Sequence, residues 1–209
     1  MVVQKSLPLL LFLLLPLFAN EYPHFSRKEL LIIQNKDKRA KRRIDDYMHQ
    51  LSQLKSLPKH KQLSKLNLYL NQLLPQYDDV TNKKADSWAT PKEFLAVGYG
   101  DCEDYVLIKY YSLVHLGFEK DKLYLTLVKV KRQRDYHMVL GYFKTPTQPP
   151  LILDNLSFRI LPLHKRKDLQ PLLFINHSGV YKWKNNKLSK VAQSYKEFEK
   201  VHQRVLKNR

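Results

Sequence analysis

The chain of 209 residues contains a single cysteine, only five glycines and eleven prolines. One cysteine cannot form a disulfide within the chain, which excludes a disulfide-stabilised scaffold and leaves the thiol as a nucleophile, a metal ligand or half of an intermolecular bridge. So little glycine and proline excludes collagen-like and low-complexity sequences. Hydrophobic residues make up 44% of the chain, which is enough to bury the core of one domain.

Long apolar runs are absent beyond the first twenty residues. Residues 7–18 carry no charge, follow Lys5 and precede Ala19, which is the order of regions in a secretory signal peptide. A run this short, interrupted by prolines, is not expected to span a bilayer, which takes ~20 apolar residues. We therefore predict a signal peptide over residues 1–19, with a retained membrane anchor as the alternative, and a single exported domain over residues 20–209.

Negative charge is scarce, since 19 Asp+Glu face 37 Lys+Arg and the formal net charge is +18. The basic residues are spread along the chain, as on a solvated surface. No helix-turn-helix, RNP or zinc-finger signature accompanies them, so nucleic acid is not an expected partner. Anionic partners remain, either lipid headgroups or an acidic protein substrate attracted by the field.

The hydrophobic period changes from helical to strand-like along the chain, which predicts an α+β fold. Apolar residues at three- and four-residue steps indicate a helical N-terminal lobe over about residues 24–75, and a polar loop is expected over residues 76–91. The expected elements are helices over residues 44–57, 63–74 and 101–116, strands over 123–130, 137–143, 151–154 and 179–183, and a closing amphipathic helix containing Val191, Tyr195, Phe198, Val201 and Val205.

The segment that carries chemistry surrounds the cysteine. Cys102 follows Gly98 and Gly100 and lies in the first turn of an expected helix, with Asp101 as its N-cap. Unpaired amides and the helix dipole at that position favour the thiolate and lower the pKa of the thiol. A buried, inert cysteine is the alternative, but glycines and carboxylates make a poor apolar pocket for one. Cys102 is therefore the candidate nucleophile.

A nucleophilic cysteine needs a base, and the base needs a residue that orients it. His137 opens one apolar strand, Asp154 ends the next, and their midpoint falls in the turn between the two strands. A symmetric hairpin would make them cross-strand partners with Cβ atoms ~5 Å apart. Asp154 could then accept the imidazole N–H and set its tautomer.

Three carboxylates flank the cysteine, those of Asp101, Glu103 and Asp104. Their charges raise the pKa of the thiol and make a compensating cation desirable. Oxygen ligands at this density suit Ca²⁺ better than zinc. Acids that complement the N-terminus of a helix are an equally good interpretation.

The motifs around these residues resemble the bacterial transglutaminase-like cysteine proteinases. The resemblance covers about residues 63–180. Its motifs are Trp88-Ala-Thr-Pro91, Gly98-Tyr-Gly-Asp-Cys-Glu-Asp-Tyr105, Lys109-Tyr110, His137-Met-Val-Leu140, Leu153-Asp-Asn-Leu156 and Arg166-Lys-Asp-Leu169 with Pro171. The resemblance implies a papain-like, transglutaminase-like core with a helical N-terminal lobe and an antiparallel sheet.

The resemblance also implies roles for individual residues. It implies Cys102 as nucleophile, His137 as base and Asp154 as the residue that orients the base. It implies calcium dependence, with ligands from Asp101 and Glu103 and a weaker third from Asp104. Oxyanion donors would include the backbone N–H of Cys102. The indole N–H of Trp88 is a second candidate, although a tryptophan more often packs in a core.

In the family, the substrate is the N-terminal region of a large surface adhesin, and an inner-membrane receptor for cyclic di-GMP sequesters the protease. The resemblance therefore implies a periplasmic endopeptidase that promotes biofilm detachment. Two other functions fit the sequence. A transglutaminase or amidase would use the same triad, because the acyl acceptor depends on the shape of the cleft and on its access to water. A basic exported adaptor would have no use for Cys102.

Overall fold

The computed structural model describes residues 23–75 and 88–207, so the expected signal peptide and most of the expected loop lie outside the described residues. No helix in the described ranges has the length and apolar character needed to cross a membrane. The helices are α1 (Arg27–Lys36), α2 (Lys38–Leu54), α3 (Lys59–Leu70), α5 (Pro91–Val97), α6 (Cys102–His115) and α7 (Lys196–Lys207), with short 3₁₀ turns η1 (Lys120–Lys122) and η2 (Leu163–Lys165).

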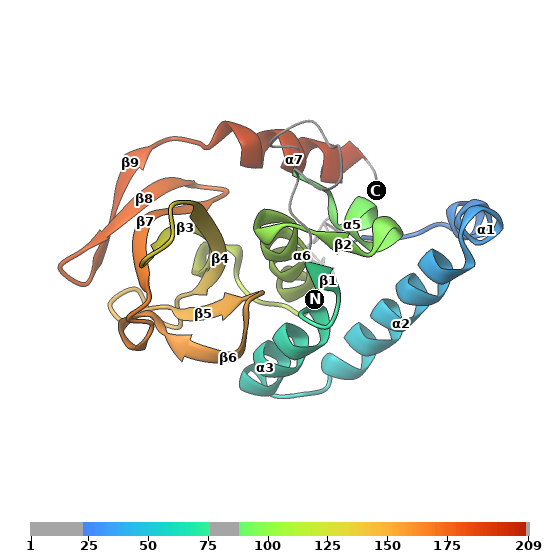
Figure 1. Cartoon of the computed structure of the whole chain (residues 1–209), viewed down its shortest axis with the longest axis horizontal. Helices are drawn as coiled ribbons and strands as arrows, with labels where there is room; N and C mark the ends of the chain where they lie inside the picture. The colour runs from blue at the N-terminus through green and yellow to red at the C-terminus, as the bar shows by residue number, and fades with distance from the viewer. Residues whose placement is uncertain (1–22, 76–87, 208–209) are drawn as a thin grey trace, which may run out of the picture.

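One antiparallel sheet of seven strands, in the order β6-β5-β4-β3-β7-β8-β9, forms one side of the molecule (Figure 1). Its strands are β3 (Leu123–Val130), β4 (Tyr136–Tyr142), β5 (Leu151–Asp154), β6 (Ser157–Pro162), β7 (Leu169–Asn176), β8 (Gly179–Lys184) and β9 (Lys187–Ala192). Two short strands, β1 (Leu74–Pro75) and β2 (Tyr99–Gly100), pair in parallel elsewhere. Helix α2 lies beyond α6 from the sheet (Figure 1), whereas α3 packs against α6 and also contacts β5 and β6.

Helix α6 is the centre of the core. Ten of its fourteen residues are buried, including Tyr105, Ile108 and Tyr110. It contacts β3 and β4 on one side and α3 and α5 on the other, and a helix enclosed on all sides must be apolar nearly all round. A smaller cluster that includes Tyr124 and Phe174 packs separately from the main core. The N-terminus of α6 is thereby fixed against β4.

Several predicted elements are confirmed and others are corrected. The third helix and the strands at residues 123–130 and 151–154 lie as expected. The closing helix is shorter than expected, because Val191 belongs to β9 and is 51% exposed. The sequence patterns did not predict α1, α5, β6, β7 and β9 as separate elements. The two strands at the edges of the sheet, β6 and β9, bury few side chains and so lack the alternation that reveals a strand.

Two glycines determine how the chain enters α6. Gly98 ends α5 with φ +89°, and the guanidinium of Arg43 packs against its Cα while donating to two carbonyls at the end of α5. At Gly100, an added Cβ would lie 2.5 Å from Oδ2 of Asp104. Both positions therefore need glycine, the first for its backbone conformation and the second for close approach.

Candidate active site

The first turn of α6 presents the thiol. Asp101 is the N-cap, as predicted, and its Oδ1 accepts from the backbone N–H of Asp104 at 3.4 Å. Cys102 follows as the first helical residue, partly buried, and its thiol donates to Oε2 of Glu103 at 2.9 Å. The helix cap thus fixes the backbone on which the nucleophile sits.

The pKa of the Cys102 thiol is raised well above its usual range, which is opposite to the lowering expected from the helix dipole alone. Burial is the largest cause, followed by the charge and hydrogen bond of Glu103, while the backbone of Met138 lowers the pKa through a hydrogen bond. Burial and the neighbouring carboxylate thus favour the neutral thiol, and a base is needed to remove its proton. The contact with Met138 places the sulfur beside the residue that follows His137.

His137 and Asp154 form a buried pair. Nε2 of His137 lies 2.8 Å from Oδ1 of Asp154, and the two residues are 8% and 1% exposed. Oδ1 also accepts from the backbone N–H of Leu156 at 3.0 Å. With Nε2 turned to the carboxylate, Nδ1 is the nitrogen left to accept the proton of the thiol.

The pair forms through a strand register that differs from the prediction. Strands β4 and β5 pair Leu140 with Leu153 and Tyr142 with Leu151, so continuing the register puts Asp154 opposite Val139. His137 comes two residues before Val139 in β4, on the same face of the strand. The two side chains therefore meet across a diagonal, which long side chains can span, and the expectation of directly opposite positions was wrong.

Arg166 begins one of the motifs that resemble the family, but the sequence assigned it no role in the site. Its Nη2 donates to Oδ2 of Asp154 at 2.9 Å, and its Nε and Nη2 bind the carboxylate of Asp168 at 2.6 to 3.2 Å. Burial raises the pKa of Asp154, but the hydrogen bonds of His137, Leu156 and Arg166 outweigh it and hold the pKa below its usual range. Lysines on both sides of Arg166 concealed it among surface cations.

The helical lobe also holds Asp154, through its backbone. Nδ2 of Asn71 donates to the carbonyl of Asp154 at 2.7 Å and to that of Ser157 at 3.0 Å. Asn67, one turn earlier, donates to the same carbonyl of Ser157 at 3.0 Å. The turn between β5 and β6 is therefore fixed by side chains from and just after α3.

A second cation is buried near Asp154. Lys109 lies two turns along α6 from Cys102 and is fully buried, and its Nζ has no hydrogen-bond partner among the described residues. Nζ lies over the ring of Tyr105, 5.9 Å from the centroid. Burial lowers the pKa of Lys109 to about 7, against an opposing effect of the Asp154 charge.

Lys109→Met should stabilise the protein and impair its activity. The folded-state pKa of about 7 lies below the unfolded value of ~10.4, so the penalty for burying the charge is complete below pH 7 and fades as the pH rises toward 10. We expect the variant to melt roughly 5 °C higher at pH 6, with a smaller gain at pH 9. Loss of the cation near Asp154 should lower kcat/KM several-fold.

Differential scanning calorimetry at both pH values, with the exposed Lys65→Met as control, checks this prediction. A variant less stable than the wild type at pH 6 would mean that Lys109 contributes net stabilisation.

The three predicted metal ligands are not brought together. Asp104 is 1% exposed and turned inward, where its Oδ1 accepts from the N–H of Ala89 at 2.6 Å. Across residues 23–75 and 88–207, no group of three or more His, Cys, Asp or Glu residues is arranged to hold a metal ion. Asp101 and Glu103 offer the oxygens that calcium prefers, but two residues do not enclose an ion. The assignment of Asp101, Glu103 and Asp104 as calcium ligands therefore stays a prediction.

Trp88 has the contacts of a core residue. It is 6% exposed and stacks on Tyr195 with ring centroids 5.8 Å apart. Its carbonyl accepts from Nη2 of Arg204 at 2.8 Å. These contacts tie α7 and the segment before it to the catalytic lobe, and a role for the indole N–H in oxyanion binding stays a prediction. The amides at the start of α6, including that of Cys102, are unpaired within the helix and are the first candidates for that role.

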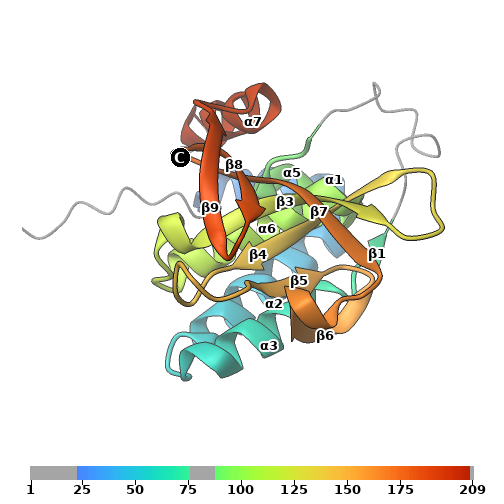
Figure 2. The same cartoon turned by 90° about the vertical axis from the view of Figure 1, so that its left-hand side faces the viewer.

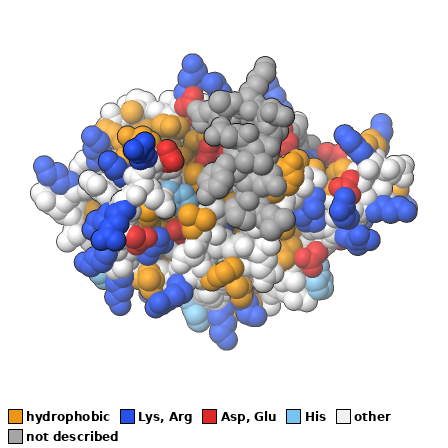
Figure 3. All heavy atoms as spheres, in the orientation of Figure 1, with side chains coloured by type: hydrophobic (Ala, Val, Ile, Leu, Met, Phe, Trp, Pro, Cys, Tyr) orange, Lys and Arg blue, Asp and Glu red, His pale blue; other side chains and the backbone are white. Residues whose placement is uncertain are grey.

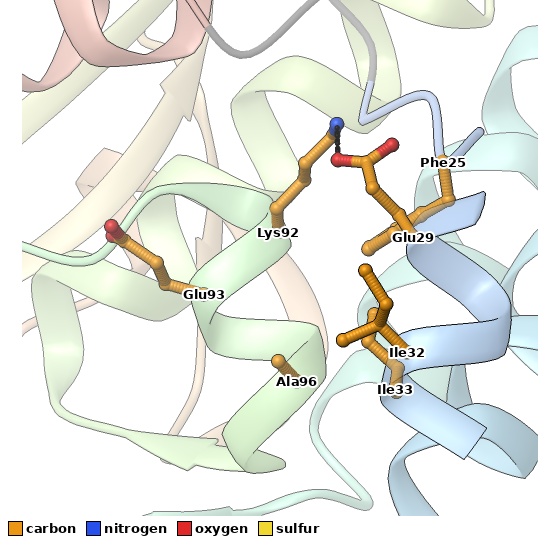
Figure 4. A pocket seen from close by; sticks show the side chains of 7 residues that line it. All are labelled: Phe25, Glu29, Ile32, Ile33, Lys92, Glu93 and Ala96. Carbon is orange, nitrogen blue, oxygen red and sulfur yellow. Dashed lines mark hydrogen bonds and ion pairs between the residues drawn. The ribbon is translucent and has the colours of Figure 1, made fainter. Parts of the chain in front are cut away.

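A surface hollow of about 260 Å³ lies away from these residues, between α1 and α5 (Figure 4). Phe25, Ile32, Ile33 and Ala96 form its apolar lining, and the ion pair between Lys92 and Glu29, 2.8 Å long, lies at one side. It contains no member of the expected triad.

Comparisons with known proteins place the chain in a family. The model of the bacterial transglutaminase-like cysteine proteinases (BTLCP) matches residues 35–169, whereas no curated protein sequence matches. Calcium-bound LapG of Legionella pneumophila is 31% identical, with a TM-score of 0.74, over 86% of this chain and 99% of that one. EGTA-treated LapG is 32% identical, with a TM-score of 0.74, over 85% and 96%. The predicted fold and enzyme class are thus confirmed, and the chain belongs to the bacterial transglutaminase-like cysteine proteinases.

Proposed function

We propose that the chain is an endopeptidase whose triad is Cys102, His137 and Asp154. The observation that carries the proposal is the buried bond of 2.8 Å between Nε2 of His137 and Oδ1 of Asp154, next to a thiol that the backbone of Met138 contacts. A carboxylate, an imidazole and a thiol in this order are the parts that nucleophilic catalysis requires.

The chemistry follows from the different partners of the two ring nitrogens of His137. Nδ1 of His137 takes the proton of the Cys102 thiol, and the thiolate attacks the carbonyl carbon of the scissile peptide. The same nitrogen then returns the proton to the departing amine, which leaves a thioester on Cys102. Water, deprotonated by His137, hydrolyses the thioester and restores the thiol. Asp154 stays ionised throughout, because hydrogen bonds from Arg166 and from the backbone N–H of Leu156 stabilise its carboxylate.

We further propose that the substrate is the N-terminal region of a large surface adhesin and that cleavage promotes biofilm detachment. The family resemblance of the motifs supports this, together with the likeness to LapG over most of both chains. By the same resemblance, the enzyme acts in the periplasm, and an inner-membrane receptor for cyclic di-GMP sequesters it.

Calcium is the proposed cofactor. LapG is known both calcium-bound and EGTA-treated, and Asp101 and Glu103 would supply carboxylate oxygens here. Bound calcium would add positive charge at the start of α6. Because Glu103 accepts from the thiol in the present arrangement, its carboxylate would have to turn away to reach an ion.

EGTA should abolish cleavage, and Asp101→Ala should lower calcium affinity at least tenfold. The exposed Glu199→Ala, on α7, is the control and should bind calcium as the wild type does. Affinity is measured by calorimetric titration of the inactive Cys102→Ala protein, so that the readout does not depend on turnover. Unchanged calcium affinity in Asp101→Ala would remove Asp101 from the ligand set.

The central experiment is cleavage of an adhesin N-terminal fragment by purified residues 20–209, with calcium and with EGTA, beside Cys102→Ala. We expect cleavage only by the wild type with calcium. A product that incorporates an added amine in place of water would favour the transglutaminase alternative. A biological effect that persists in Cys102→Ala would favour the adaptor.

A further inference from the structure

Two neighbouring loops beside the catalytic pair carry five exposed cations. The first loop joins β3 to β4 and projects beyond the end of the sheet (Figure 2). The second begins with Lys165, the last residue of η2, and runs into β7. Together they form what we call the basic rim, which consists of Lys131, Arg132, Arg134, Lys165 and Lys167.

The basic rim is connected to the catalytic residues by short, direct links. His137 lies in β4, two residues after the end of the first loop. Arg166, in the second loop, donates to Asp154 at 2.9 Å. The two loops also bind each other, because the backbone N–H of Lys131 donates to the carbonyl of Asp168 at 2.9 Å. A polypeptide leaving the site on the side of His137 and Asp154 would therefore pass the rim.

The charge of the rim is largely uncompensated. None of its five cations forms an ion pair with any residue in the described part of the chain. Two acids lie in the same loops, Asp135 and Asp168. The carboxylate of Asp168 is held by Arg166, which leaves Asp135 as the one nearby acid outside such a pair in these loops.

Arg132 occupies a position that would suit glycine. Its φ is +67° in the turn after β3, the left-handed region that is uncommon for residues with a Cβ. A glycine there would relieve the backbone without altering a buried contact, since the side chain is exposed. The turn therefore keeps an arginine where the backbone alone favours glycine.

We propose that the basic rim binds acidic residues of the substrate polypeptide on one side of the scissile bond. This inference rests on the proposed function and names a feature of its substrate. Lysines and arginines lie at both sides and along the lower edge of the face shown in Figure 3, so net charge alone does not locate a partner. The position of the rim next to the catalytic pair is what favours a substrate segment over a lipid surface.

The test uses two peptides with the same central sequence, taken from the adhesin fragment, with either glutamates or glutamines on one flank. Each side is tried in turn. Binding to Cys102→Ala is measured by fluorescence anisotropy at low and at physiological salt, and cleavage by the active enzyme is followed in parallel. We expect about tenfold tighter binding of the acidic peptide on one side only at low salt, with the preference reduced by salt.

Three changes locate the effect. Charge reversal of Lys131, Arg132 and Arg134 to glutamate should make the glutamine peptide bind more tightly than the glutamate peptide. The matched control reverses Lys38, Arg39 and Arg42 on α2, which Figure 1 shows across α6 from the sheet, and should leave the preference unchanged. Arg132→Gly should reduce the ratio between the peptides while the melting temperature stays equal or rises.

Equal binding of the two peptides by the wild-type surface would overturn the inference. So would a loss of the preference for the acidic peptide in the α2 control as large as that in the rim reversal. So would binding of anionic phosphatidylglycerol vesicles that the rim reversal abolishes while the peptide ratio stays at one. Because binding is measured on the inactive protein, an absence of cleavage counts against the proposed function and leaves this readout intact.

Discussion

Replacing His137 with alanine should lower kcat/KM for the adhesin fragment by about 10⁴-fold without unfolding the protein. Burial and Glu103 hold the pKa of the Cys102 thiol above its usual range, so almost none of the thiol ionises unaided near neutral pH. His137 is the base that the geometry provides, and Asp154, the other member of the buried pair, cannot replace it. The residual rate would come from binding and from the amides at the start of α6.

The test of His137→Ala needs proof that the variant is folded, and a control variant with wild-type activity. Urea denaturation should show that His137→Ala retains a cooperative transition, and the exposed His60→Ala on α3 should cleave at the wild-type rate. A normal rate in His137→Ala would refute the triad, because proton removal from the thiol would then have another route.

Asp154→Asn should lower kcat/KM by about 10³-fold, because hydrogen-bond donors face both oxygens of the Asp154 carboxylate and the NH₂ group of asparagine would be a further donor. Oδ1 accepts from His137 and Leu156, whereas Oδ2 accepts from Arg166. An amide has an acceptor on one side only. Its NH₂ group must therefore face either the guanidinium of Arg166 or the N–H groups of His137 and Leu156, and the second arrangement favours the wrong tautomer of the base.

A second substitution should relieve the conflict. Arg166→Gln offers a carbonyl oxygen to the amide, so Asp154→Asn with Arg166→Gln should be about tenfold more active than Asp154→Asn alone. Arg166→Gln by itself should lower the rate about tenfold, because Asp154 loses its cation. Steady-state kinetics of the four proteins form a double-mutant cycle. Rates that simply multiply would show that Arg166 does not act through Asp154.

Sequence reasoning could reach the residues that carry both chemistry and a structural signal. Cys102 follows a glycine-rich turn into a helix, and His137 and Asp154 begin and end expected strands. The register between those strands depends on pairing that no single strand encodes, so the diagonal contact could not be foreseen. The role of Arg166 could not be predicted, because it depends on a fold that buries this one cation among many. The direction of the Cys102 pKa depends on burial, which a local pattern does not report.

The strands of the sheet also differ in how far the sequence predicts them. β3 and β5 are predominantly apolar because the core covers them, whereas β6 is only half-buried and β9 is largely exposed. The short helix α5 was missed although Thr90 and Glu93 form a capping box at its start, since seven residues give too few turns for a period to emerge.

The amides of Asn67 and Asn71 have a consequence for any attempt to reduce the enzyme to a minimal fragment. A piece of the chain that begins after Asn71, the residue that follows α3, would contain Cys102, His137, Asp154 and Arg166, and would look complete by its catalytic motifs. It would nevertheless lack the two side chains that hold the backbone at Asp154 and Ser157. The smallest autonomous catalyst that can be cut from this sequence therefore includes α3, and the helical lobe is part of the enzyme's working machinery rather than an appendage that domain engineering can discard.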